Sequence, residues 1–312
     1  MPSYSGVWTL PAQMQAQGAS NWPSQPLPPY ALFVSGRLDS SVAQNTIDYV
    51  NITTTGNATS WGTLNYAGDA YQGACASSTT AVFAAGALGN YWTSLTFATQ
   101  GNTTNFAAAG NSYGPQGCNS STRGVFGGNE TPTSVMYYLT IATTGTISSF
   151  GNLAFNRSWS ASCSSSTRGL FAGGASTDTS AIEYITIATT GNATTFGNLT
   201  SVSPNHAAGC STSTTGLFMG LTTGFSNTID QVTIATTGNA TSFGQLTSAR
   251  NQSSAASSTT RGVFGGGKTS VTTVNTIDYV TVASAGNATS FGQLTSARYV
   301  LTGVGNYNGG VQ

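Results

Sequence analysis

Residues with chemically reactive side chains are few in this chain, and they recur at fixed places instead of gathering in one motif. The 312 residues include one histidine, four cysteines, eight acidic and eight basic side chains, and the formal net charge is zero. The histidine, His206, follows Pro204-Asn205, and nothing marks out a serine or aspartate partner for it. We therefore expect no catalytic residues, no metal site and no cofactor.

The four cysteines occupy one place in successive sequence repeats. Each lies five residues before the same position of an apolar run, and Ala256 stands there in the last copy: Cys75, Cys118, Cys163 and Cys210. This equivalence favours a small buried residue over a ligand. A disulfide would need two Cα atoms within about 7 Å, and a metal would need several convergent ligands. Both alternatives stay open at this stage.

Ten of the sixteen charged residues fall into three repeated sets. The sets are Asp48, Glu183, Asp230 and Asp278; Arg123, Arg168 and Arg261; and Arg157, Arg250 and Arg298. Repeated opposite charges in a charge-poor chain predict structural ion pairs within or between repeats. The third set leads from an outer strand toward the centre of the predicted fold. Its members are therefore also candidate binding residues for an anionic glycan or a carboxylate.

An internal repeat sets all of these positions. The phrase Thr-Thr-Gly-Asn-Ala-Thr-Ser-Phe-Gly occurs six times with small changes, at intervals of 45, 44, 46, 47 and 48 residues between its first glycines. Those glycines are Gly56, Gly101, Gly145, Gly191, Gly238 and Gly286. A period of this length indicates one supersecondary unit per repeat, which buries its apolar faces against its neighbours.

Each repeat predicts four short strands. An apolar run such as 32–36 is typical of a strand buried on both faces, and the alternating segment 47–52 predicts a second strand. A third begins at a fixed aromatic residue, Trp61 in the first repeat, and a small polar segment such as 161–166 supplies the fourth. Four strands in about 45 residues describe a β-propeller blade.

The two ends of the repeat region complete each other. The first repeat starts at its apolar run without a preceding small-residue strand, and residues 299–305 form a strand without a repeat of their own. If the C-terminal strand completes the first blade, the ring closes and no sheet edge stays open. We predict an all-β, six-bladed propeller over residues 31–312, preceded by an arm of residues 1–30.

The repeat resembles that of the kelch family of propellers. The matching features are a Gly-Gly pair after the apolar strand, an acidic residue followed by Tyr, an aromatic and then an arginine, as in Gly265-Gly266, Asp278-Tyr279, Phe291 and Arg298. The resemblance covers residues 30 to 306 and implies the propeller fold. The chain departs from the family where Phe replaces the usual Trp and where Thr93-Ser94 replaces the acidic-Tyr pair.

A narrower resemblance concerns structural proteins of aquatic tailed bacteriophages. It is carried by Arg-Gly-Val-Phe-Gly-Gly, by Thr-Ile-Asp-Tyr-Val, by the nine-residue phrase, and by the opening Gly6 to Leu10 with Asn21-Trp22-Pro23. This resemblance implies a virion protein and does not specify its place on the particle.

The arm belongs to no repeat. Its prolines favour an extended path, and residues 11–17 are compatible with one or two helical turns. One interpretation is an arm packed against the outside of a blade. The other is an anchor whose Trp8, Met14 and Trp22 dock on another virion subunit.

The composition limits the kinds of partner that the chain can bind. Charged residues make up 5% of the chain, against about 25% in ordinary soluble domains, and no basic excess is present to bind nucleic acid or an anionic membrane. No apolar run approaches the about 20 residues of a membrane span, and no signal peptide is visible. The Asn-X-Ser/Thr triplets at Asn57, Asn192, Asn239 and Asn287 belong to the repeated turn, where we expect Gly-Asn to supply positive φ angles, so we do not expect glycosylation there.

Taken together, these patterns favour a non-enzymatic bacteriophage virion protein, present in several copies and attached through its arm to capsid or tail proteins. Its expected roles are host adhesion as part of a tail fibre, with a host surface glycan as a further partner, or decoration of the capsid or tail. The alternatives are a bacterial propeller that binds a glycan or another partner, and one that processes a glycan, for which two carboxylates in one cleft would be needed.

Overall fold

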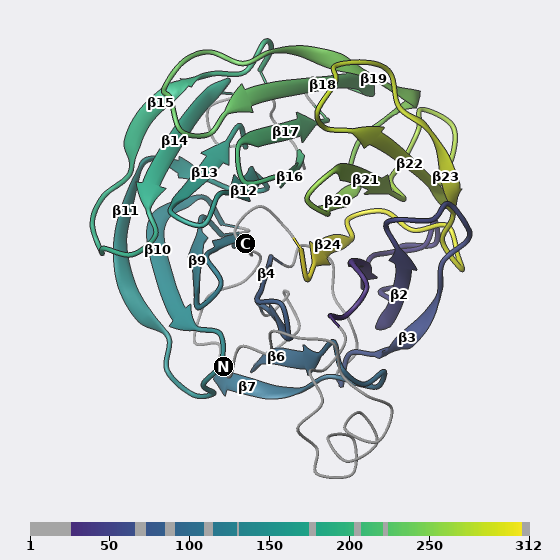
Figure 1. The fold of residues 1–312 in the computed structure, drawn as a ribbon, viewed down its shortest axis with the longest axis horizontal. Coiled ribbons are helices and arrows are strands. Elements are labelled where there is room, and N and C mark those ends of the chain that lie inside the picture. The colour runs from purple at the N-terminus through teal and green to yellow at the C-terminus, as the bar shows by residue number, and fades with distance from the viewer. Residues whose placement is uncertain are drawn as a thin grey trace, which may run out of the picture.

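The computed structural model describes residues 26–65, 73–84, 91–108, 115–129, 131–174, 179–202, 207–220 and 224–307. All regular structure in these ranges is β-strand, arranged as six four-stranded antiparallel sheets around one axis (Figure 1). The predicted six-bladed propeller is therefore confirmed. The same ranges contain no helix with the length and apolarity of a membrane span.

Each blade is one sheet, and we number the blades 1 to 6 along the chain. The strands are given from the innermost to the outermost. Blade 1 contains β24 (Thr302–Gly305), β1 (Tyr30–Val34), β2 (Thr46–Asn51) and β3 (Thr59–Thr63), and blade 2 contains β4 (Ala74–Ala76), β5 (Thr80–Phe83), β6 (Tyr91–Thr96) and β7 (Thr104–Ala108). Blade 3 contains β8 (Gln116–Asn119), β9 (Arg123–Gly127), β10 (Thr133–Thr140) and β11 (Ser148–Arg157). Blade 4 contains β12 (Ala161–Ser164), β13 (Arg168–Ala172), β14 (Ala181–Thr186) and β15 (Thr194–Asn198), and blade 5 contains β16 (Ala208–Ser211), β17 (Thr215–Met219), β18 (Ser226–Thr233) and β19 (Thr241–Arg250). Blade 6 contains β20 (Ser254–Ser257), β21 (Arg261–Gly265), β22 (Thr276–Thr281) and β23 (Thr289–Gln293).

The hydrophobic core is divided among the seams between neighbouring blades. Six clusters of buried side chains are present, and each joins two adjacent blades. Phe264 of blade 6, for example, packs with Leu217 and Phe243 of blade 5. The phenylalanine at this place of every second strand is fully buried: Phe33, Phe83, Phe126, Phe171, Phe218 and Phe264. A single blade therefore has no complete core, as expected of a repeat unit.

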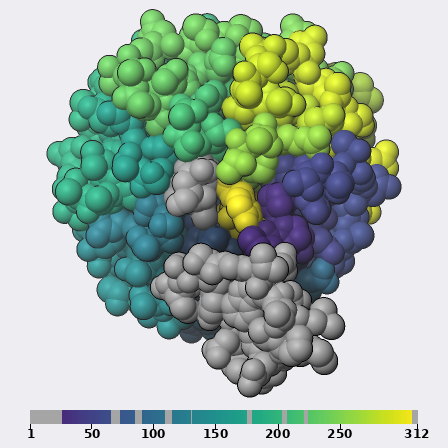
Figure 2. All heavy atoms as spheres, in the orientation of Figure 1, coloured from purple at the N-terminus to yellow at the C-terminus, as the bar shows by residue number. Residues whose placement is uncertain are grey.

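The C-terminal strand closes the ring. β24 pairs antiparallel with β1, with Leu32 opposite Val304, and so supplies the innermost strand of blade 1. Figures 1 and 2 show the yellow C-terminal strand beside the purple start of the ring, near the axis. The closure that the two ends of the repeat region predict is therefore present, and the blade that it completes has no open inner edge.

The ring has two faces that differ in what they display. We call the face that carries the turns at Gly56, Gly101, Gly145, Gly191, Gly238 and Gly286 the turn face. At the opposite face, each second strand ends and each innermost strand begins, as the pairing of Val34 with Thr302 shows. Since the chain crosses there from an outermost strand to the next innermost strand, we call it the crossover face.

Both ends of the described chain meet at the turn face. The Tyr30 N–H donates to Asn306 Oδ1 at 2.7 Å, and Asn306 Nδ2 donates to the Pro28 carbonyl at 3.1 Å. The Ile52 N–H donates to the Pro29 carbonyl at 2.8 Å. Asn306 therefore fastens the segment before β1 to the segment after β24.

Candidate functional site

The repeated acidic side chains connect blades 1, 4, 5 and 6 each to the preceding blade. Asp48 accepts hydrogen bonds from the Thr295 N–H at 3.0 Å and the Thr295 hydroxyl at 2.8 Å. Asp278 makes the same contacts with Thr247, and Asp230 makes them with Thr200. In each case the acid lies on the third strand of one blade, and its donor lies near the outermost strand of the preceding blade.

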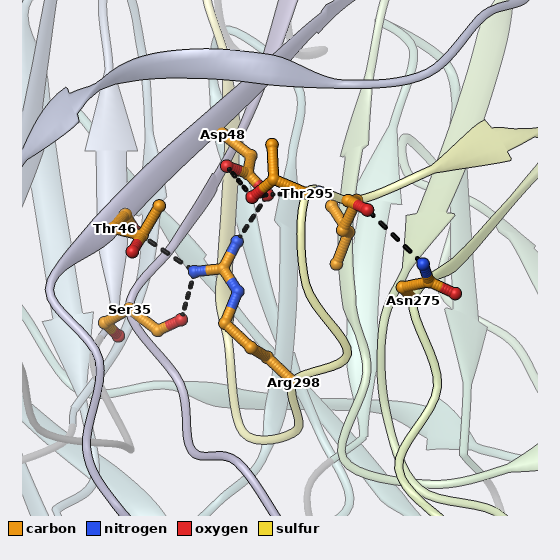
Figure 3. A network of polar contacts seen from close by, with 7 residues as sticks. Ser35, Thr46, Asp48, Asn275, Thr295 and Arg298 are labelled. Atoms are coloured by element: carbon orange, nitrogen blue, oxygen red, sulfur yellow. Dashed lines mark hydrogen bonds and ion pairs between the residues drawn. The ribbon is translucent and has the colours of Figure 1, made fainter.

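Three of these acids also form buried ion pairs with the third arginine set. Arg298 Nη2 lies 2.7 Å from Asp48 Oδ2, and both side chains are fully buried at the seam between blades 6 and 1. The other guanidinium nitrogen, Nη1, donates to the Ser35 and Thr46 carbonyls at 2.7 and 3.1 Å (Figure 3). One arginine thus joins the side chain and the backbone of the next blade.

The same arrangement recurs at two other seams. Arg157 Nε lies 2.8 Å from Glu183 Oε2 between blades 3 and 4, and Arg250 Nη1 lies 3.0 Å from Asp278 Oδ2 between blades 5 and 6. Each arginine also donates to a backbone carbonyl of the following blade, that of Gly173 for Arg157 and that of Phe264 for Arg250. Burial lowers the pKa of all three guanidinium groups, and the paired carboxylates oppose that shift.

This geometry confirms structural ion pairs between blades and assigns them to the third arginine set. Arg157, Arg250 and Arg298 have no exposed area. Binding of an anionic ligand by these arginines would require their guanidinium groups to leave the ion pairs.

The seam between blades 4 and 5 differs. Asp230 is buried like its counterparts, and its carboxylate accepts from the Thr200 N–H and hydroxyl, each at 2.8 Å. No ion pair to Asp230 occurs among the described residues. In the sequence, the position that holds Arg157, Arg250 and Arg298 at three of the other seams is occupied by Ser203, outside the described residues. Burial raises the pKa of the Asp230 carboxyl from its ordinary value, and the hydrogen bonds from Thr200 oppose that shift.

The second arginine set joins blades in another way, through backbone carbonyls and tyrosine rings. The Arg168 guanidinium lies over the Tyr184 ring at 4.4 Å from its centroid, and its Nη1 donates to the Ile234 and Ala235 carbonyls of the next blade at 2.9 and 2.8 Å. Arg123 and Arg261 make the equivalent contacts. Tyrosine holds each guanidinium in place while the arginine binds a strand end across the seam.

The repeated Gly-Asn turn docks on the outermost strand of the preceding blade. Asn57 Oδ1 accepts from the Gln293 N–H at 3.1 Å, and the Gly56 N–H donates to the Phe291 carbonyl at 2.9 Å. A Cβ at Gly292 would lie 2.1 Å from the Gly56 carbonyl oxygen. The glycine after the aromatic is therefore needed because two backbones come into contact there.

This docking corrects the sequence interpretation of the turn. Gly56, Gly191, Gly238 and Gly286 do not adopt the left-handed region, and a Cβ at any of them would meet nothing within 4 Å. The asparagine side chain serves as an acceptor across the seam and does not supply a positive φ angle. The repeated phrase is therefore a docking sequence between blades.

The four cysteines are free and buried on the innermost strands. Each sulfur packs against a glycine of the following blade; a Cβ at Gly169, for example, would lie 2.3 Å from Cys118 Sγ. Burial raises the pKa of each thiol, in the case of Cys210 to about 12. The small buried role is confirmed, and the disulfide alternative is wrong.

Sequence reasoning missed a ladder of polar side chains between the innermost strands. The Ser211 N–H donates to Ser257 Oγ at 3.1 Å, and that hydroxyl donates to the Ser211 carbonyl at 2.7 Å. The same two-bond exchange joins Ser164 to Ser211 and Asn119 to Ser164, and the Asn119 amide joins Ala76. We call Asn119, Ser164, Ser211 and Ser257 the polar ladder. Its sequence signal is a hydrogen-bonding residue directly after each cysteine position in blades 3 to 6.

The innermost strands also enclose an axial cavity of about 80 Å³. At the crossover face it is lined by Trp159, Gln252 and Val300, which precede the innermost strands of blades 4, 6 and 1. These three residues have φ angles of 53°, 56° and 52°. A β-branched residue such as Val300 adopts this left-handed conformation only under tertiary constraint. The lining also includes Asn119, Ser164 and Ser211 of the polar ladder.

Three sequence predictions, the anchoring roles of Trp8, Met14 and Trp22, lie outside the described residues, and so does His206. Within the described ranges, no group of three or more histidine, cysteine or acidic side chains is placed to hold a metal ion.

Comparison with known proteins adds no family to this geometry. No protein-family model matches the chain, and no curated protein matches it significantly in sequence.

Proposed function

We propose that the chain is a non-enzymatic structural protein of a bacteriophage virion, a rigid kelch-like ring attached to capsid or tail proteins through its N-terminal arm. It is present in several copies on the particle. Its role is adhesion to the host surface as part of a tail fibre, or decoration of the capsid or tail.

The observation that carries this proposal is the use of charge. Six of the eight basic side chains connect one blade to the next, and three of them do so through buried ion pairs. Four acidic side chains lie at the same seams. The described part of the ring thus commits its charge to its own assembly, which suits a rigid, nearly uncharged particle component.

The placement of the chain ends supports attachment through the arm. Residues 28–30 enter the ring at the turn face, beside Asn306. An arm that leaves from the turn face can hold the ring while the crossover face points away from the attachment site. A display protein requires such an arrangement.

The glycan-processing alternative has less support. Hydrolysis of a glycoside requires two carboxyl groups about 5 to 10 Å apart in one cleft. Asp48, Glu183 and Asp278 instead pair with arginines at three separate seams, where they are fully buried.

The test uses particles purified from a culture in which this chain is encoded by the infecting phage. Mass spectrometry should detect the chain in the particles at several copies, and immunogold labelling should place it on the tail or the capsid. Trp8→Ala with Trp22→Ala should release the protein from particles while the purified ring stays folded. Absence of the chain from washed particles would refute the proposal.

A further inference from the structure

The seam between blades 2 and 3 differs from the others at four repeated positions. The turn of blade 3 holds Thr146 in place of the docking asparagine, and β7 holds Ala107 in place of the glycine that the turn contacts. The acid position of blade 3 holds Tyr137, and the position of the second arginine set in blade 2 holds Thr80. We infer that the ring opens at this seam by local separation of the two blades, and that opening exposes the thiol of Cys75. The inference goes beyond the proposed function and requires only the folded ring.

The repeated phrase does not dock at this seam. At the other five seams, the turn asparagine accepts a hydrogen bond from a backbone N–H of the preceding outermost strand at 3.0 or 3.1 Å. A Cβ at the glycine that each turn contacts would lie 2.0–2.2 Å from a turn carbonyl oxygen. Ala107 has that Cβ, so the turn of blade 3 cannot come as close, and its Gly145 adopts a φ angle of 118°. Among the described residues, Thr146 makes no hydrogen bond to blade 2.

The polar contacts of the other seams are stronger. Charged side chains cross the four seams from blade 3 round to blade 1. Neutral side chains cross the seam between blades 1 and 2, where Gln100 Nε2 donates to the Tyr49 hydroxyl at 2.7 Å. Between the described residues of blades 2 and 3, the hydrogen bonds are those of the Asn119 amide with the Ala76 backbone. Apolar packing therefore supplies most of the attraction across this seam.

The apolar contacts are close but not directional. Cys75 and Trp92 of blade 2 share one buried cluster with Phe126 and Leu139 of blade 3, and the rings of Trp92 and Phe126 meet edge to face with centroids 4.5 Å apart. The Trp92 indole nitrogen and the Thr93 hydroxyl are buried without a hydrogen-bond partner among the described residues. Opening would hydrate both polar groups and would break no ion pair that the described residues form, so it costs less here than at an ion-paired seam.

The opening seam lies next to the blades that hold the arm (Figure 1). Leu27 packs against the buried cluster that joins blades 1 and 2, and the Pro28 carbonyl accepts a hydrogen bond from Asn306. A load applied through the arm therefore enters blades 1 and 2. The closing seam on one side of this pair of blades is reinforced by Arg298 and Asp48, whereas the seam to blade 3 has no such pair in the described ranges.

The four cysteines report on four different seams. Cys75 has no exposed area, and the other three are 2–5% exposed, so faster reaction of Cys75 would reflect opening and not static exposure. Burial raises the pKa of the Cys75 thiol, which therefore reacts only once it is exposed. Each Sγ packs against a glycine of the following blade: Cys75 against Gly124, Cys118 against Gly169, Cys163 against Gly216 and Cys210 against Gly262.

The experiment follows the reaction of the purified full-length chain with N-ethylmaleimide, in urea below the unfolding transition. Mass spectrometry of peptides gives the rate at each cysteine. Cys75 should react at least about tenfold faster than Cys118, Cys163 and Cys210, because a thiol reacts in proportion to the open population of its seam. Equal rates at the four cysteines, or the fastest reaction at another one, would overturn the inference.

A restored docking pair tests the cause. Ala107→Gly with Thr146→Asn gives the seam between blades 2 and 3 the residues that dock at the other five seams. This variant should slow the reaction of Cys75 at least about threefold and leave the other three cysteines unchanged. An unchanged rate at Cys75 would show that the missing contacts do not control opening, and the inference would be wrong.

The reciprocal change at an intact seam is the matched control. Gly151→Ala with Asn192→Thr removes the docking pair between blades 3 and 4. It should accelerate the reaction of Cys118 and leave that of Cys75 unchanged. Asn192→Thr alone is the milder variant if the double variant does not fold, and it should act in the same direction. Acceleration at all four cysteines, or at none, would contradict seam-specific opening.

Discussion

The seam between blades 5 and 6 and the seam between blades 4 and 5 use the same acidic position in different ways. Asp278 accepts hydrogen bonds from Thr247 and pairs with Arg250, whereas Asp230 accepts equivalent bonds from Thr200 alone. Neither acidic residue has exposed area. In the four blades that carry the acid, the common element of the seam is therefore the contact between the acid and the preceding outer strand, to which an arginine is added in three.

The difference predicts that the two seams depend on charge to different degrees. Removing one partner of a buried ion pair lowers the free energy of unfolding strongly, because the remaining charge is buried without a counter-charge. A buried acid held by neutral donors already bears the cost of desolvation in its raised pKa.

The largest effect is expected from Arg250→Ala. It leaves Asp278 buried without its cation and should lower the free energy of unfolding by about 3–5 kcal/mol, measured by urea denaturation. Arg250→Met is the control, because it fills the space without restoring the charge. If Met recovers most of the stability, packing explains the contribution of Arg250 and the ion pair does not.

A smaller effect is expected where backbones meet across a seam. A Cβ at Gly292 would lie 2.1 Å from the Gly56 carbonyl oxygen, so Gly292→Ala should cost about 2–3 kcal/mol in the same assay. Gly56→Ala adds a methyl group where nothing lies within 4 Å, and it should change stability by less than about 1 kcal/mol. Equal losses in the two variants would contradict the docking role of the repeated phrase.

The polar ladder should contribute somewhat less. Ser211→Ala removes the hydroxyl that bonds both the N–H and the carbonyl of Ser164, and we expect a loss of about 1–2 kcal/mol. Hydrogen exchange at the Ser164 amide should accelerate, while amides of the outermost strands of blades 1 and 2 should keep their protection. A uniform change over the ring would instead indicate global destabilisation.

The smallest expected effect is a difference between the two seams in how stability depends on pH. Since the pKa of Asp230 is raised in the folded ring, its protonation favours the folded state, and this contribution is lost as the pH rises through the folded pKa. Asp230→Asn should therefore gain stability relative to the wild type as the pH rises from 3 to 7, by no more than about 1 kcal/mol.

Asp278→Asn is the comparison for that variant. It removes the negative charge from Arg250 and should be clearly destabilising at pH 7. Equal behaviour of the two asparagine variants would show that the arginine makes no difference between the seams.

The sequence predicted the architecture well because the fold repeats. Six copies of a turn and an aromatic define six blades, and the two incomplete ends define the closure between β1 and β24. Burial of the cysteines could also be predicted, since equivalent positions in a ring have equivalent surroundings. Contacts inside a blade and the order of strands follow from periodicity alone.

The contacts between neighbouring blades were harder to predict from the sequence. Which arginine set meets the acids depends on where two strands from different blades end, and the sequence does not show that distance. The role of Gly292 depends on the backbone of Gly56, which lies at the other end of the chain. The cavity mouth depends on left-handed residues such as Val300, whose type gives no signal for that conformation.

The central claim is that buried charge joins the first and last blades as it joins internal ones. A double-mutant cycle on Arg298→Ala and Asp48→Ala, measured by urea unfolding, tests it directly because this pair bridges the closing seam. We predict a coupling free energy above about 1.5 kcal/mol, with the double variant far less unstable than the sum of the single ones. Additivity within about 0.5 kcal/mol would contradict the claim.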